Sequence, residues 1–158
     1  MNIFKASEIL KIAIQIEKNG LAFYNGIKER TKNFTTQEVF GFLAKEEEKH
    51  KKTFEQLLED VGDYQPVQSY PGEYELYLEA LASENIFRKE ADLKKIAKDI
   101  NSDSQAIDMG IGFEKDSIIF YGEMKNFVPK EEGAIVDDVL LEEKEHLLKL
   151  FGLKKQGF

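Results

Sequence analysis

Both histidines of this sequence lie three residues after a glutamate. His50 follows Glu47 in the stretch EEEKH, and His146 follows Glu143 in EEKEH. Residues three apart lie on the same face of an α-helix, so each pair can direct a carboxylate and an imidazole at one point. Both groups are common ligands of transition-metal ions. A single pair of this kind is usually a solvated surface pair, but two pairs that use every histidine indicate a shared metal site.

Four glutamates occupy positions where helical periodicity places core residues. The residues one and two turns away are mainly apolar for each of them: Glu17, Glu47, Glu114 and Glu143. Each ion buried in a common core costs several kcal/mol. Two divalent cations would neutralise four such charges, and two neutral imidazoles would complete the ligand set. The sequence therefore predicts a centre of two metal ions, held by these glutamates together with His50 and His146.

Two tyrosines share helix faces with two of these glutamates. Tyr24 and Tyr121 lie seven residues after Glu17 and Glu114. Each is either a core residue whose hydroxyl is hydrogen-bonded elsewhere, or a residue that donates a hydrogen bond to a metal-bound carboxylate. The sequence leaves both interpretations open.

The glutamate-rich motifs also contain carboxylates that lie further from the apolar stripes. Glu46 and Glu142 precede the histidines by four residues, so they remain one turn away from them. We expect these two side chains to be solvated, and we place Glu48 and Glu145 on the surface.

Four long blocks with apolar residues at three- and four-residue spacing predict four helices. They cover about 7–30, 35–61, 102–128 and 130 to the C-terminus. Thr35 with Glu38, and Ser102 with Gln105, have the spacing of a capping box at the second and third helix. Shorter helices are predicted at YELYLEALA (74–82) and ADLKKIAKDI (91–100).

The long connection between the second and third helices determines the topology. Residues 62–101 can travel back along a helix of about 25 residues, which is about 38 Å long. Helices joined by short loops pack antiparallel, whereas parallel neighbours need such a crossover. IEKNGLAFYNGIK near the N-terminus also matches FEKDSIIFYGEMK 97 residues later. We therefore expect an all-α four-helix bundle of two similar up-down hairpins, with helices 1 and 2 facing helices 3 and 4.

Composition excludes several classes of function. The net charge of −8 argues against a nucleic-acid partner. The chain contains no cysteine, which excludes disulfides, zinc–thiolate sites and iron–sulfur clusters within it. No apolar window is long enough to span a membrane, and the N-terminus lacks the pattern of a secretory signal. We therefore expect a cytoplasmic protein.

These motifs resemble those of the rubrerythrin branch of the ferritin-like superfamily. IEKNGLAFY and FEKDSIIFY are similar to its paired motifs on helices 1 and 3, and EEEKH and EEKEH to its Glu-x-x-His motifs. The resemblance implies a single ferritin-like domain over 1–158, with hairpins at about 7–61 and 102–156 around the crossover. It implies two iron ions bridged by Glu47 and Glu143, although manganese or zinc would also be possible. The implied ligands are Glu17, Glu47, His50, Glu114, Glu143 and His146.

Two features depart from rubrerythrins proper. Their rubredoxin-like domain delivers electrons through an iron held by four cysteines, and this chain has no cysteine. They also carry a further glutamate one turn after the helix-3 ligand, where this chain has Ser117. That carboxylate lets one iron change ligands with its oxidation state. We therefore expect a six-ligand site without this exchange.

The leading functional hypothesis is a di-iron redox enzyme that reduces peroxide or dioxygen. Its electrons would come from an external donor protein, since this chain has no cysteines to carry them. The main alternative is a module without turnover that oxidises, sequesters or senses iron. A helical scaffold with a purely structural site is a third possibility. A homodimer formed through the tyrosine-rich crossover is also plausible.

Overall fold

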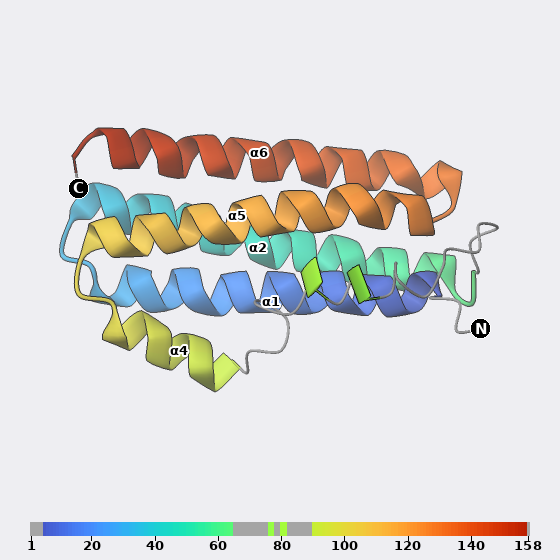
Figure 1. The fold of residues 1–158 in the computed structure, drawn as a ribbon, viewed down its shortest axis with the longest axis horizontal. Coiled ribbons are helices and arrows are strands. Elements are labelled where there is room, and N and C mark those ends of the chain that lie inside the picture. The colour runs from blue at the N-terminus through green and yellow to red at the C-terminus, as the bar shows by residue number, and fades with distance from the viewer. Residues whose placement is uncertain (1–4, 65–75, 78–79, 82–89, 158) are drawn as a thin grey trace.

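In the computed structural model, residues 5–64, 76–77, 80–81 and 90–157 are described, and every regular element among them is helical. Four long helices lie along the length of the molecule, and a shorter one lies beside the first (Figure 1). The predicted all-α four-helix bundle is confirmed. The α-helices are α1 (Ala6–Arg30), α2 (Phe34–Val61), α4 (Glu90–Asp99), α5 (Asp103–Met124) and α6 (Gly133–Lys155).

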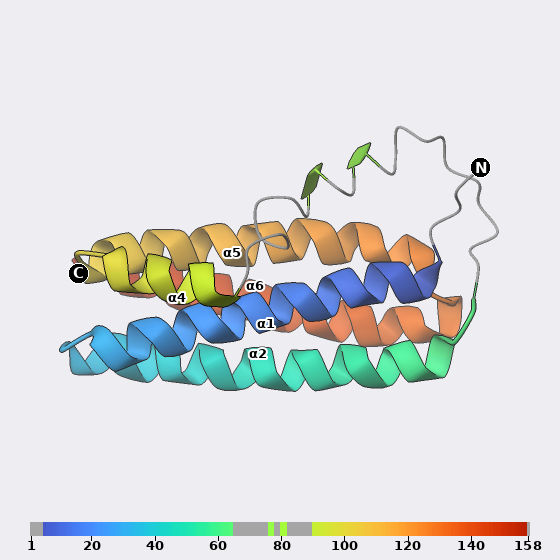
Figure 2. The same ribbon diagram turned by 90° about the horizontal axis from the view of Figure 1, so that it is seen from below.

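The long helices form two antiparallel hairpins. Residues 31–33 join α1 to α2, and α5 is followed by α6 in the second hairpin (Figure 1 and Figure 2). α2 ends at the opposite end of the bundle from the start of α5 (Figure 1 and Figure 2). α1 packs against α2 and α5, and α6 packs against α5 and α2. The two hairpins therefore face each other, as the topology argument predicts.

The helix starts differ in part from the sequence prediction. Asn33, and not Thr35, caps α2, because its side-chain oxygen accepts from the backbone N–H of Thr36 at 2.9 Å. The capping box expected at Thr35 is therefore wrong by two residues. At α5 the prediction holds, since the Ser102 hydroxyl accepts from the backbone N–H of Gln105 at 3.1 Å.

The junction between α5 and α6 is longer than expected. α5 ends at Met124, and two 3-10 turns follow, η1 (Lys125–Phe127) and η2 (Lys130–Glu132). Phe127 and Val128 are buried there, so the chain tightens over the end of the core before α6 begins at Gly133. The predicted boundaries at residues 128 and 130 therefore overextend both helices by a few residues.

The described part of the crossover packs on α1. The predicted helix at 91–100 is observed as α4, and Leu93, Ala97 and Ile100 are buried. A Cβ atom at Gly26 of α1 would lie 2.8 Å from the Cβ atom of Ala97, so glycine allows the close approach of α4. The Arg30 guanidinium also donates to the carbonyl oxygen of Ala97. Residues 76–77 and 80–81 are helical, and the rest of the predicted segment 74–82 lies outside the described residues.

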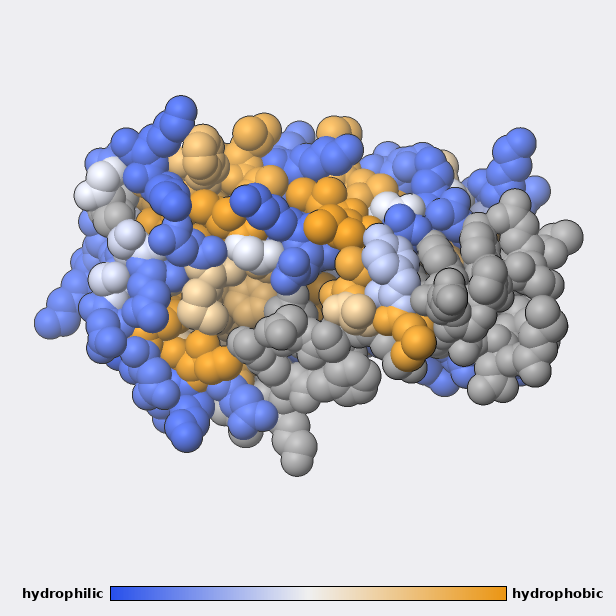
Figure 3. Space-filling view, in the orientation of Figure 1, coloured by the Kyte–Doolittle hydropathy of each residue, from blue (hydrophilic) through white to orange (hydrophobic). Residues whose placement is uncertain are grey.

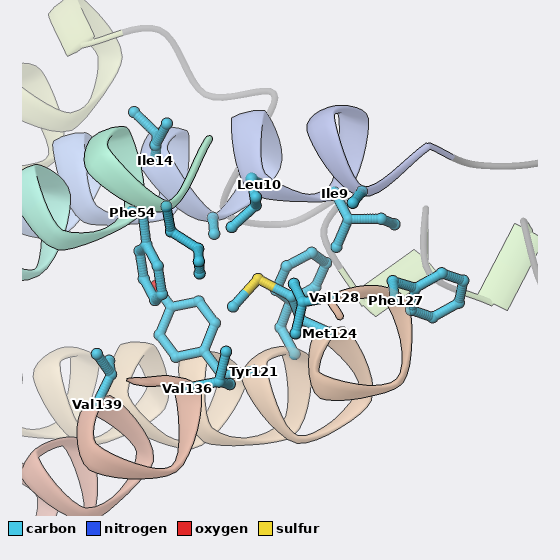
Figure 4. Close-up of a cluster of buried hydrophobic side chains, with 14 of the residues drawn as sticks. Ile9, Leu10, Ile14, Phe54, Tyr121, Met124, Phe127, Val128, Val136 and Val139 are labelled. Carbon is cyan, nitrogen blue, oxygen red and sulfur yellow. The ribbon is translucent and has the colours of Figure 1, made fainter. Parts of the chain in front are cut away.

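Two hydrophobic clusters fill the two ends of the bundle. One contains Leu10, Phe54, Tyr121 and Met124, whose side chains gather between the helices in Figure 4. The other contains Phe23, Tyr24, Phe40, Leu43 and Leu150. Hydrophilic side chains cover much of the outside, with hydrophobic residues visible between them (Figure 3). Among the described helices, none has the length and apolar character needed to cross a membrane.

Candidate metal centre

The six residues predicted as metal ligands come together between the two hydrophobic clusters. α1 and α5 each contribute one glutamate, and α2 and α6 each contribute a Glu-x-x-His pair. Each of the six is at most 4% exposed, although all are ionisable. The structure places them at the following positions: Glu17 in α1, Glu47 and His50 in α2, Glu114 in α5, and Glu143 and His146 in α6.

The Nδ1 atom of each imidazole points into this cluster. His50 Nδ1 lies 2.8 Å from Glu143 Oε1 and 3.8 Å from Glu17 Oε2. The two imidazoles are stacked, with ring centroids 5.4 Å apart and planes inclined by 22°. Ligand-capable atoms of the two Glu-x-x-His pairs all lie within 4.8 Å of one another.

The second histidine has a similar set of neighbours. His146 Nδ1 lies 3.7 Å from Glu114 Oε2 and 3.6 Å from Glu143 Oε2. Glu47 Oε1 is also 3.6 Å away from it. Each histidine is thus paired with one glutamate of α1 or α5, and Glu143 approaches both histidines through different oxygens.

Several polar atoms of the cluster form no hydrogen bond of good geometry, although His50 Nδ1 and Glu143 Oε1 lie only 2.8 Å apart. The atoms without such a bond are Glu17 Oε2, Glu47 Oε1, His50 Nδ1, both carboxylate oxygens of Glu143, and His146 Nδ1. Buried polar atoms without partners are costly, and in native proteins they usually indicate a missing ion or water. Carboxylate oxygens and imidazole nitrogens are also the donors that divalent transition metals accept. This donor set therefore fits a pair of divalent metal ions.

The two tyrosines donate hydrogen bonds across the bundle. The Tyr24 hydroxyl of α1 donates to Glu114 Oε1 of α5, and the Tyr121 hydroxyl of α5 donates to Glu17 Oε1 of α1. Burial, followed by the nearby glutamates, raises the pKa of both tyrosines well above the usual range, so both remain protonated donors. The structure thus favours the interpretation in which each tyrosine hydroxyl donates to a glutamate of the cluster. It also shows that each tyrosine binds the glutamate of the other helix, α5 for Tyr24 and α1 for Tyr121.

The glutamates do not ionise alike in the metal-free cluster. Burial and the neighbouring Glu143 raise the pKa of Glu17 to about 7. Burial and nearby carboxylates also raise the pKa values of Glu47 and Glu114 well above the usual range. Burial acts on Glu143 in the same direction, but contacts with both histidines hold its pKa well below its usual range. One ionised glutamate thus lies among carboxyls that tend to keep their protons.

The histidines are held in their charged form by these glutamates. Burial disfavours the imidazolium, yet contacts with Glu143 and Glu17 raise the pKa of His50 to about 9, and contacts with Glu114 and Glu143 raise that of His146 to about 10. Ligands must lose their protons before they bind a metal. Metal binding at neutral pH therefore has to displace protons from both imidazoles.

Glu142 corrects the expectation that it is solvated. Its Oε2 lies 2.7 Å from His50 Nε2, and the Lys49 ammonium donates to its Oε1 at 3.0 Å. The side chain is 34% exposed. The stripe of its own helix could not reveal this contact, because Glu142 is in α6 and His50 is in α2. Glu46 is also partly covered, with its carboxylate 3.5 Å from the Lys49 ammonium.

Gly20 is a further site residue that the sequence argument missed. A Cβ atom at this position would lie 2.7 Å from Glu47 Oε2, so the absence of a side chain makes room for that carboxylate. A signal was present, because a buried glycine in the middle of a helix costs up to about 1 kcal/mol relative to alanine. Ser117, 97 residues later, occupies the corresponding position of α5 and is buried.

Comparisons with known proteins agree with this geometry. The family model named rubrerythrin matches residues 8–154. A solved structure of a candidate ferritin-like diiron-carboxylate protein from Thermotoga maritima is 25% identical, with a TM-score of 0.75. That match covers 100% of this chain and 99% of the other. Among curated proteins, no relative matches. The resemblance seen in the sequence motifs is confirmed: the chain belongs to the rubrerythrin family.

Proposed function

We propose that this protein is a di-iron redox protein that reduces peroxide or dioxygen with electrons from an external donor protein. The observation that carries the proposal is the buried set of four glutamates and two histidines, in which six carboxylate and imidazole atoms face one another without a hydrogen bond of good geometry. Family membership supports the same class of centre.

The distances indicate which residues would hold each ion. Glu17 with His50 would hold one, and Glu114 with His146 the other. Glu143, which approaches both histidines, and Glu47 would be shared between them. A carboxylate-rich set shared by two ions suits iron, whereas manganese or zinc would accept the same donors.

When bound, a ferrous pair supplies the two electrons that convert one peroxide and two protons into two waters. The chain itself restricts what can react. Its six candidate ligands are at most 4% exposed, so only a small molecule reaches them without opening the bundle. Hydrogen peroxide and dioxygen meet this requirement.

The tyrosines orient the glutamates of α1 and α5. Tyr121 occupies Glu17 Oε1, and the other oxygen, Oε2, faces His50. Tyr24 occupies Glu114 Oε1 in the same way, and Oε2 faces His146. Each hydroxyl therefore binds one carboxylate oxygen and leaves the other, which would be available to a metal ion, facing a histidine.

An iron-oxidising or sensing module without turnover is the second candidate. Ser117 favours it, because no carboxylate is available there for an exchange of ligands between oxidation states. The absence of cysteine favours it too, since this chain has no thiolate site to return electrons.

Stopped-flow mixing can distinguish an enzyme that reduces peroxide or dioxygen repeatedly from a module that oxidises its iron without turnover. Protein loaded anaerobically with Fe(II) would be mixed with hydrogen peroxide or dioxygen while an iron titration gives the stoichiometry. We expect oxidation that stops near two irons per chain and repeated turnover only with an added reductant. Loading well beyond two irons would favour storage, and oxidation by neither oxidant would indicate a structural metal site.

A further inference from the structure

The two histidines differ on their outward side. His50 Nε2 lies 2.7 Å from Glu142 Oε2, whereas no described side chain hydrogen-bonds to Nε2 of His146. The ring of Phe42 instead packs edge-on against His146, with centroids 6.0 Å apart. The two imidazoles thus share the same kind of inward neighbours but have different outer support.

The difference arises where the two halves of the sequence repeat carry different residues. At an offset of 96 residues, Glu46 corresponds to Glu142, but Lys49 corresponds to Glu145. The Lys49 ammonium lies 3.0 Å from Glu142 and 3.5 Å from Glu46. The carboxylate that supports His50 is therefore held by a cation in α2, whereas the corresponding position of α6 carries a glutamate.

A carboxylate behind a metal-binding imidazole changes how that imidazole binds. It fixes the tautomer with the proton on the outer nitrogen, orients the ring, and makes the inner nitrogen more basic. At His50 the outer nitrogen is Nε2 and the inner one is Nδ1, which faces Glu143 and Glu17. His146 has no such acceptor among the described residues.

We propose that Glu142, held by Lys49, is a positioning residue that makes the metal position beside His50 and Glu17 the tighter of two unequal positions, so that it fills first. The inference deepens the proposed function and rests on it only in requiring two bound ions. It concerns metal affinity, and it applies whether or not the centre turns over.

Titration of the metal-free protein with Co(II), followed by visible absorption, tests the proposal. We expect two distinguishable binding steps in the wild type. Glu142→Ala should weaken the tighter step about 10- to 100-fold, the usual range for loss of such a support. Glu142→Gln, which keeps an oxygen acceptor, should restore part of it. Glu145→Ala, at an exposed position of the same helix, is the control and should leave both steps unchanged.

A spectroscopic readout separates positioning from a general loss of stability. In Zn(II)-loaded protein with ¹⁵N-labelled histidine, the Nε2–H proton of His50 should be protected from exchange by its bond to Glu142. Glu142→Ala should remove that protection and leave the His146 signals in place. A change of both histidines together would contradict a role specific to His50.

Failure of this inference and failure of the proposed function give different results. Two Co(II) ions bound with equal affinity in the wild type would overturn the inequality while leaving the di-metal centre intact. Equal effects of Glu142→Ala and Glu145→Ala would likewise overturn the role of Glu142. Absence of Co(II) binding in the wild type would overturn the metal centre itself, and this inference with it.

Discussion

In the α1–α2 hairpin the helices meet through residues 31–33 and an asparagine cap, whereas the α5–α6 hairpin turns through two 3-10 segments. Their inward positions nevertheless carry matching residues: Glu17 with Glu114, Tyr24 with Tyr121, Glu47 with Glu143, and His50 with His146. The next layer outward differs, as Lys49 against Glu145 and Gly20 against Ser117 show. The candidate metal ligands and the two tyrosines therefore follow the approximate two-fold symmetry of the hairpins, whereas the residues that contact them from outside do not.

The largest effect should come from removing the matched histidines together. His50→Ala with His146→Ala should abolish most transition-metal binding, because both imidazole donors of the centre are lost. Elemental analysis of protein loaded with Fe(II) would then fall from about two ions per chain to near zero, as expected for loss of the metal donors. Unchanged stoichiometry in this double variant would show that the metal ions lie elsewhere.

A large effect is also expected from pH on the metal-free chain. The pKa of Glu17 rises from 4.5 to about 7, and those of His50 and His146 from 6.5 to about 9 and about 10. The folded chain therefore holds more protons than the unfolded chain, and its free energy of unfolding falls as pH rises from about 4.5 to about 10. Glu143, whose pKa is lowered, gives the opposite trend only in the acid range.

Urea unfolding of the metal-free protein at about pH 5, 7 and 9 measures this decline. Metal-loaded protein should instead gain stability from about pH 5 to about pH 7 and then level off, because bound metal requires ligands that the unfolded chain deprotonates only in that range. A metal-free chain that gains stability between neutral and alkaline pH would contradict the clustering of these groups.

An intermediate effect tests the two-fold relation of the donor set. Glu17→Gln and Glu114→Gln each remove one ionisable group from the buried cluster and should stabilise the metal-free chain by about 1–3 kcal/mol at alkaline pH. Both should lower the stability gained from metal, because each loses an ionised donor. Thermal unfolding with and without Zn(II) measures both changes. A gain in only one variant would show that the two halves differ in charge as well as in outer support.

The smallest change in stability is expected where the support differs. Gly20→Ala should alter the free energy of unfolding of the metal-free chain by no more than about 1 kcal/mol, since alanine favours the helix. Its Cβ atom must nevertheless displace Glu47 Oε2, which would be only 2.7 Å away, so metal affinity should fall. Isothermal titration with Zn(II) measures the affinity. Ser117→Ala is the matched control, and an equal loss there would remove the distinction.

Helical periodicity, the Glu-x-x-His spacing, the internal repeat and the length of the crossover together predicted the bundle and the meeting of its six buried ionisable residues. These patterns missed contacts between helices. Glu142 lies off the stripe of α6, yet it reaches His50 of α2. The partner of each tyrosine also depends on how the hairpins face each other. Asn33 was missed as a cap because the downstream Thr35 offered a competing pattern.

The crossed tyrosine bonds have a consequence for the origin of the fold. In neither hairpin does the tyrosine bind the glutamate of its own helix, because Tyr24 donates to Glu114 and Tyr121 donates to Glu17. Two identical hairpins related by a two-fold axis would satisfy both bonds with a single sequence, as any isologous dimer repeats its contacts. Joining the copies into one chain removes the requirement that both halves mutate together. A duplicated ancestor would thus keep a symmetric centre while position 49 came to differ from 145 and position 20 from 117.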